Sequence, residues 1–200
     1  MKIKICGLRT PGDANAVNEA MPDYIGFILT EGFKRSVDEV SAQLISKFID
    51  PQIGRVGVFV DDDPKRIKRL VYNGLIDIVQ LHGNESDDYI KDLKSGEGSI
   101  IKVFDASGDL DMDKVMKCPA DMVMFDAGKG GGERFDWNKV KDCKRPFFLA
   151  GGIGPGNIKE AIDFFKGSQL YALDLSSSVD KGGSKNTDLV IQAVNEAHGN

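Results

Sequence analysis

Eight short apolar runs, repeated at nearly even spacing, constrain the fold of this chain more than any other feature. They are IKIC ending at Cys6, YIGFIL ending at Leu29, RVGVFV ending at Val60, IDIVQL ending at Leu81, SIIKVF ending at Phe104, DMVMFD ending at Asp126, PFFLA ending at Ala150 and LYALDL ending at Leu175. A polar stretch of helical length separates each run from the next, and the mean spacing is about 24 residues. This alternation predicts βα units and a parallel sheet.

The polar stretches carry helix start and stop signals. DDDPKRIKRLVYNG offers Asp63 as an N-cap, Pro64 at the first helical position and Gly74 after the end. NESDDYIKDLKSG offers Ser86 as a cap. The segment that begins at Trp137 has a weaker pattern, which predicts a helix of only one or two turns.

Eight βα units in 200 residues favour a closed (β/α)₈ barrel, the α/β TIM-barrel class, over an open doubly wound sheet. We expect residues 1–200 to form one barrel domain, because no linker or low-complexity segment interrupts the pattern. In both architectures ligands bind where the strands end. Cys6 and Asp126 both stand at such ends.

Composition excludes several other classes of protein. The net charge is −5, from 26 basic and 31 acidic residues without a basic block, so we expect no nucleic-acid partner. No apolar run is long enough to span a membrane, and no signal peptide is apparent. Cys6, Cys118 and Cys143 lack CxxC spacing, which indicates free thiols in a reducing cytoplasm and no zinc site. The acidic run Asp61–Asp63 is interpreted as a helix start, not as a metal site.

Two late segments are suited to binding a phosphate group. LAGGIGPGN follows the seventh strand, and its Gly151 and Gly152 let main-chain N–H groups approach a ligand closely. LDLSSSVD follows the eighth strand and adds main-chain amides and the hydroxyls of Ser176 and Ser177. Barrels often hold phosphate with these two loops. Tight turns and helix capping are the alternative role for each segment alone.

Taken in order along nearly the whole chain, the motifs KICGL, GF with KRS, RVGVFV, VQLHG, FDA, GGGERFDW, LAGGIGPGNI and LDLSSSVD resemble the phosphoribosylanthranilate isomerase family of tryptophan biosynthesis. The resemblance implies a barrel that converts N-(5′-phosphoribosyl)anthranilate into 1-(2-carboxyphenylamino)-1-deoxyribulose 5-phosphate. This Amadori rearrangement needs no cofactor and no metal. The implied partner is a small phosphorylated substrate, and the chain is expected to be a monomer or a homodimer.

The resemblance assigns roles to named residues. Cys6 matches the family's general base and Asp126 its general acid, while Arg35 matches the residue that pairs with the anthranilate carboxylate. The other expected substrate-binding residues are Gly151, Gly152, Asp174, Ser176 and Ser177. Acid–base chemistry then requires a protonated Asp126 beside an ionised Cys6, so the two groups need opposite environments.

Other polar residues near the strand ends receive lesser roles. His82 is interpreted as a loop histidine that shapes the site without transferring protons, and Gln80 is expected to point into the barrel. Cys118 and Cys143 are expected to take no part in catalysis or substrate binding. GKGGGERFDW, residues 128–137, is interpreted either as a mobile loop that closes over the ligand or as a long connector.

The strand-eight motif departs from the family pattern, which usually has glycine where Ser178 stands and glutamate where Asp180 stands. If that glycine needs a positive φ, Ser178 would strain the phosphate loop. Two rival functions stay open: another phosphate-binding barrel such as indole-glycerol-phosphate synthase, and a non-catalytic phosphate-sugar binder. The first relies on strand lysines, and only Lys102 is placed in that way. A histidine-pathway ribonucleotide is a further possible substrate.

Overall fold

The computed structural model describes residues 1–96, 98–127 and 134–199. Its principal strands are β1 (Lys2–Cys6), β2 (Tyr24–Ile28), β3 (Gly54–Phe59), β4 (Ile78–Leu81), β5 (Ser99–Asp105), β6 (Met122–Asp126), β7 (Phe147–Leu149) and β8 (Leu170–Leu175). The helices are α1 (Pro11–Ala20), α2 (Glu39–Ser46), α3 (Pro64–Tyr72), α4 (Asp87–Lys94), α5 (Met112–Lys117), α6 (Ile158–Phe164) and α7 (Thr187–His198). Short elements complete the chain: the 3₁₀ turns η1 (Trp137–Lys139) and η2 (Ser177–Val179), and the two-residue strands β9 (Asp180–Lys181) and β10 (Ser184–Lys185).

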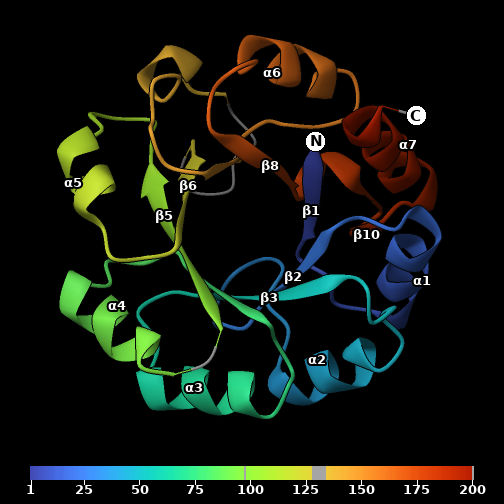
Figure 1. The fold of residues 1–200 in the computed structure, drawn as a ribbon. Helices are drawn as coiled ribbons and strands as arrows, with labels where there is room; N and C mark the ends of the chain where they lie inside the picture. Colours follow the sequence, from blue (N-terminus) through green and yellow to red (C-terminus); the bar gives the residue numbers. More distant parts are fainter. Residues whose placement is uncertain (97, 128–133, 200) are drawn as a thin grey trace.

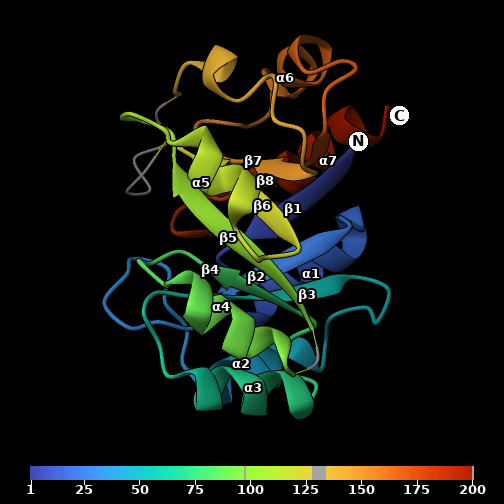
Figure 2. The ribbon, with the colours of Figure 1, turned by 60° about the vertical axis from the view of Figure 1, so that its left-hand side comes forward.

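The eight principal strands close into a parallel barrel in sequence order, with β8 paired to β1 (Figure 1). The helices lie outside this ring, and the second view shows them stacked around the strands (Figure 2). The prediction of a closed (β/α)₈ barrel is confirmed, and the open sheet is excluded. Every predicted strand end lies within one residue of the observed end.

Local chemistry explains where the helices begin. Asp63 caps α3 by accepting a hydrogen bond from the Lys65 amide, and Pro64 occupies the first helical position. Ser86 caps α4 in the same way. Among its described residues, the connection from β6 to β7 forms the short turn η1 and no longer helix, as its weak pattern predicted. Its indole, Trp137, packs against the phenyl ring of Phe164 with ring centroids 5.4 Å apart.

Side chains fill the interior of the barrel in layers, as is usual for this architecture. The pairing register places Cys6 near the mouth, in a layer with inward residues of β3, β5 and β7. The next layer down is contributed by the even-numbered strands: Gly26, Gln80, Met124 and Asp174. The middle of the barrel is therefore polar on the β8–β1–β2 side and apolar around β5–β7, where Val103, Met124 and Phe148 pack together.

The two ends of the described chain meet at the foot of the barrel, opposite the mouth. The Met1 ammonium group donates a hydrogen bond to the Ala197 carbonyl oxygen at 2.8 Å, and α7 packs beside α1 (Figure 1). Among the described helices, none combines the length and apolar character needed to cross a bilayer.

Candidate active site

Cys6 ends β1 with its side chain inside the barrel and almost fully buried. It pairs in register with Gly26 of β2, and this glycine makes room for it. A Cβ atom at Gly26 would lie 2.7 Å from the Cys6 sulfur and 3.2 Å from the Lys4 Nζ atom. Glycine is therefore required here by the close approach of two functional side chains.

Lys4 is the residue that sequence reasoning missed. Its side chain is fully buried inside the barrel, and its Nζ atom donates a hydrogen bond to Asp174 Oδ1 at 2.8 Å. Lys2, Lys4 and Cys6 alternate along β1, so the period-2 rule already places all three on one face. That alternation was the available signal. Asp174, which was expected to bind substrate, is held by this ammonium group.

Asp126 ends β6 and faces the same interior as Cys6. Gly151, which follows β7, has φ +83°, and a Cβ atom there would lie 3.2 Å from Asp126 Oδ1. The His82 Nε2 atom lies 3.6 Å from Asp126 Oδ2, which is close but beyond an ordinary hydrogen bond. His82 was predicted to be a loop histidine that shapes the site, and in the structure it lies directly beside Asp126, the predicted general acid.

Electrostatics divide the mouth of the barrel into two environments. Burial raises the pKa of Asp126, and the nearby Asp174 and Asp105 carboxylates raise it further, against the opposing effect of His82. Burial also lowers the pKa of His82, although the Asp126 and Asp174 carboxylates act in the opposite direction. Asp126 is thereby biased toward its protonated form.

At Cys6, burial likewise raises the thiol pKa, which stays above its ordinary value although cations oppose burial. The Lys4 ammonium is the strongest influence that lowers the pKa, Lys185 adds to it, and Asp174 acts in the opposite direction. Since Asp174 influences the pKa of both Cys6 and Asp126, the structure brings the two predicted catalytic groups to one shared interior.

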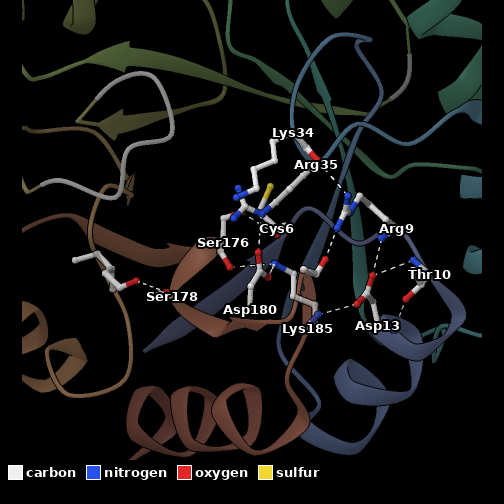
Figure 3. Close-up of polar contacts among 12 residues, drawn as sticks. Cys6, Arg9, Thr10, Asp13, Lys34, Arg35, Ser176, Ser178, Asp180 and Lys185 are labelled. Carbon is white, nitrogen blue, oxygen red and sulfur yellow. Dashed lines mark hydrogen bonds and ion pairs between the residues drawn. The ribbon is translucent and has the colours of Figure 1, made fainter.

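Arg35 lies in the loop after β2, and an acidic residue fixes its orientation. Its Nε atom donates to Asp180 Oδ2 at 2.7 Å, and Lys185 Nζ donates to Asp180 Oδ1 at 2.7 Å (Figure 3). Within the described residues the terminal Nη atoms of Arg35 have no hydrogen bond. Burial alone would raise the Asp180 pKa, but Lys185 and Arg35 outweigh it and hold this pKa below its ordinary value. Aspartate at this position therefore serves as the acidic bridge.

The loops after β7 and β8 contact each other through Ser178. Its hydroxyl donates to the Ile153 carbonyl oxygen at 2.6 Å, and a Cβ atom at Gly154 would lie 2.5 Å from the Ser178 Cβ atom. Ser178 lies in η2 and is not among the described residues with a positive φ. The positive φ under which a serine would strain the loop is therefore not present here, because Ser178 lies in a 3₁₀ turn.

Four main-chain donors gather at these two loops. The N–H groups of Gly151, Gly152, Ser176 and Ser177 make no hydrogen bond to any described part of the chain. Gly151 and Gly152 both have positive φ, at +83° and +68°. The Ser176 hydroxyl donates a hydrogen bond to the Cys6 carbonyl oxygen at 3.1 Å. This bond connects the loop after β8 to the end of β1; we call this loop and the loop after β7, which carry the four free N–H groups, the phosphate-type loops.

Gln80, Lys102 and the two other cysteines were also singled out in the sequence, and the structure shows where each lies. Gln80 points into the barrel as predicted, is buried, and its Oε1 atom has no partner among the described residues. Lys102 does not reach the interior: it faces outward from β5 and pairs with the buried Glu85 at 2.8 Å. Cys118 and Cys143 are buried in the core between barrel and helices and stay free thiols.

Two further predictions concern metals and the glycine-rich loop. No group of metal-ligating side chains forms within residues 1–96, 98–127 and 134–199. Residues 128–133, which carry most of the segment interpreted as a mobile loop, lie outside the described residues.

Comparison with known families settles which barrel this is. The family model for N-(5′-phosphoribosyl)anthranilate (PRA) isomerase matches residues 3–196. The chain belongs to this family. The N-(5′-phosphoribosyl)anthranilate isomerase of Endomicrobium trichonymphae is 39% identical over 201 residues, covering 96% of each sequence. That of Lactiplantibacillus plantarum is 35% identical and covers 98% of this chain and 92% of the relative.

Solved PRA isomerase structures agree with this assignment. The Thermotoga maritima enzyme superimposes with a TM-score of 0.89 at 29% identity, over 100% of both chains. A PRA isomerase bound to reduced 1-(o-carboxyphenylamino)-1-deoxyribulose 5-phosphate superimposes with a TM-score of 0.86 at 28% identity, also over 100% of both chains. The fold and family predicted from the motifs are confirmed.

Proposed function

We propose that this chain catalyses the Amadori rearrangement of N-(5′-phosphoribosyl)anthranilate to 1-(2-carboxyphenylamino)-1-deoxyribulose 5-phosphate in tryptophan biosynthesis. The observation that carries the proposal is the pairing of Cys6 and Asp126. Both end strands of one barrel, both face its interior, and both are linked electrostatically to Asp174. Family membership supplies the substrate class.

The reaction moves protons at three atoms of the substrate, and two side chains suffice for the transfers. Asp126, whose pKa is raised by burial and by neighbouring carboxylates, donates a proton to the ribose ring oxygen, which opens the ring to a Schiff base. The Cys6 thiolate then removes the proton from C2′ and leaves an enolamine. Tautomerisation of the enolamine to the ketone completes the rearrangement.

The same proposal assigns the binding of the two charged ends of the substrate. Asp180 uses only the Nε atom of Arg35, so the two Nη atoms form a planar fork suited to the anthranilate carboxylate. The unused N–H groups of Gly151, Gly152, Ser176 and Ser177 suit the phosphate group. Local donors of this kind must overcome the net charge of −5, which repels a substrate that carries a carboxylate and a phosphate.

Loss of anthranilate fluorescence on incubation with PRA tests the proposal directly. We expect turnover by the wild-type chain and a loss of at least about 10²-fold in Cys6→Ser and in Asp126→Asn, each with an unchanged fold. Cys118→Ser is the matched thiol control, because Cys118 lies in the outer core, and it should keep its turnover. Binding of PRA without turnover by the wild-type chain would instead indicate a phosphate-sugar binder.

The proposal also covers the cellular location, the oligomeric state and the substrate range of the protein. We propose a cytoplasmic enzyme that acts as a monomer or a homodimer; one solved Thermotoga maritima relative is described as dimeric. Sedimentation equilibrium on the active protein distinguishes the two states. Assay with the aldose ribonucleotide of histidine biosynthesis decides whether that compound is also a substrate, and the proposal for PRA stands on its own result.

A further inference from the structure

Burying a lysine in the centre of a barrel is costly unless its charge is used. Lys4 is fully buried, and moving an ammonium ion out of water carries a large desolvation penalty. The Asp174 carboxylate 2.8 Å away offsets part of this cost. A well-packed apolar pair would serve stability as well or better, so stability alone does not account for a cation at this position.

The position of the charge relative to Cys6 gives it a use. The Lys4 Nζ atom and the Cys6 sulfur both lie within about 3.2 Å of the point where Gly26 would carry a Cβ atom. Gly26 contributes no side chain between them, so the charge of the ammonium group acts on the thiol with no side chain of Gly26 in the way. Asp174 holds the other side of the same ammonium group.

We propose that Lys4 is a positioning residue whose buried ammonium group, oriented by Asp174, stabilises the thiolate form of Cys6. The proposal rests on the assignment of Cys6 as the base in the proposed function. Asp174 then has two opposed effects: it holds Lys4 in place, and its own negative charge disfavours the thiolate. Lys4 and Asp174 together set how readily Cys6 loses its proton.

Other charged groups also face Cys6. Lys185 of β10 influences the thiol from the side of the phosphate-type loops, and it is itself held by Asp180 at 2.7 Å. The residue of β2 that pairs with Cys6 is Gly26, which carries no charge. Lys4 is therefore the charged group whose influence on Cys6 is largest and favours ionisation, while Asp174 is the principal group that opposes it. Replacing these two side chains should shift the thiol in opposite directions.

Thiolate absorbance in the ultraviolet, followed against pH, measures the ionisation of Cys6 without any substrate. Subtracting the Cys6→Ser protein removes the signals of tyrosines and of the other two thiols. We expect Lys4→Met to raise the apparent pKa of Cys6 by about one unit or more, which lowers the thiolate fraction about tenfold. Asp174→Asn should lower it. Lys2→Met is the matched control, because Lys2 lies on the same face of β1 two residues further from the mouth, against Tyr24 and Tyr171.

A second variant protects the test against misfolding, because Lys4→Met leaves the Asp174 carboxylate buried without its partner. In Lys4→Met/Asp174→Asn both charges are absent, and the Cys6 pKa should still exceed that of the wild type, since the ammonium has the larger influence. Cys6 titrating at or below the wild-type pKa in this double variant would overturn the proposal, as would equal effects of Lys4→Met and Lys2→Met.

Kinetics give an independent readout. If Lys4 acts through the thiolate, Lys4→Met should lower kcat near neutral pH and recover part of the loss at higher pH, whereas a merely structural lysine would give a loss that does not depend on pH. The titration needs no turnover, so failure of the wild-type isomerase assay would reject the proposed function and leave the Lys4 result standing. An unshifted titration with normal turnover would reject the role of Lys4 alone.

Discussion

Adding one methyl group at Gly26 should disable the site without removing any functional atom. The new Cβ atom of Gly26→Ala would lie 2.7 Å from the Cys6 sulfur, whereas uncrowded contacts between heavy atoms lie at roughly 3.5–4.0 Å. The sulfur, or the strand that carries it, must therefore move by about 1 Å. A displacement of that size costs about 10²-fold in rate when it affects a reacting group.

The same substitution overpacks the barrel, so stability falls as well. Overpacking of this kind costs about 1–3 kcal/mol, and in a domain of this size each kcal/mol lowers Tm by about 2–4 °C. Steady-state kinetics and thermal unfolding on the same preparation separate the two effects. We expect kcat to fall about 10²-fold, with Tm lowered by about 2–12 °C.

Two other glycines provide matched controls. Gly57 of β3 faces outward, and a Cβ atom there would lie 2.6 Å from Ile76 Cδ1, so Gly57→Ala should lower Tm similarly but leave kcat close to wild type. Gly108 has open space around its Cβ position and a φ outside the left-handed region, so Gly108→Ala should change neither property for the worse. Wild-type kcat in Gly26→Ala, or an equal loss of kcat in Gly57→Ala, would refute the reasoning.

Three further predictions concern the residues around the mouth. Burial raises the folded-state pKa of Asp126, so its ionisation opposes folding as pH rises above the ordinary value of 3.8. Asp126→Asn should therefore have a higher Tm than the wild type at pH 7. The difference in Tm should disappear in scans below about pH 4. Arg35→Lys should raise KM for PRA by about tenfold or more with a smaller change in kcat, because lysine cannot form two parallel hydrogen bonds; an unchanged KM would contradict the pairing. Gln80→Leu removes a buried amide oxygen that has no partner among the described residues, so the free energy of unfolding measured with denaturant should rise by about 1 kcal/mol. KM for PRA rises as well if the amide contacts the substrate. A lower free energy of unfolding would show that the amide is hydrogen-bonded in the wild type.

The fold was accessible from sequence because backbone periodicity and turn chemistry are local. The run that ends at Asp126 and the caps Asp63 and Ser86 lie where the sequence places them. Strand order followed from the regular alternation of strands and helices, since parallel neighbours need crossover connections. The weak pattern after Trp137 correctly indicated a turn in place of a full helix.

The candidate site was predictable only in part. The motifs named Cys6, Asp126 and Arg35, but they did not show what each side chain contacts. Asp180 replaces a glutamate, and no local pattern says that it bridges Arg35 and Lys185, because these residues come from the loop after β2 and from β10. Such contacts between distant segments depend on closure of the barrel.

Lys4 illustrates the second limit of sequence reasoning. A lysine in or near a strand is usually a solvated cation. Lys102 was considered because it is a lysine within a predicted strand. The structure places the two lysines differently: Lys102, which was considered for the site, faces outward to Glu85, while Lys4, which received no role, points inward to Asp174. The alternation along β1 gave the direction of Lys4, but only the missing side chain at Gly26 brings its charge to Cys6.

Opposite protonation states at one barrel mouth require an uneven distribution of charge, because burial alone acts in the same direction on both groups. Burial raises the pKa of the Cys6 thiol and of the Asp126 carboxyl group alike. What distinguishes the two is the charge of their neighbours: ammonium groups oppose the effect of burial at Cys6, whereas the Asp174 and Asp105 carboxylates add to it at Asp126. A base and an acid can thus share one cavity because Lys4 and Lys185 place positive charge beside the thiol, and removing these two charges should disfavour the thiolate.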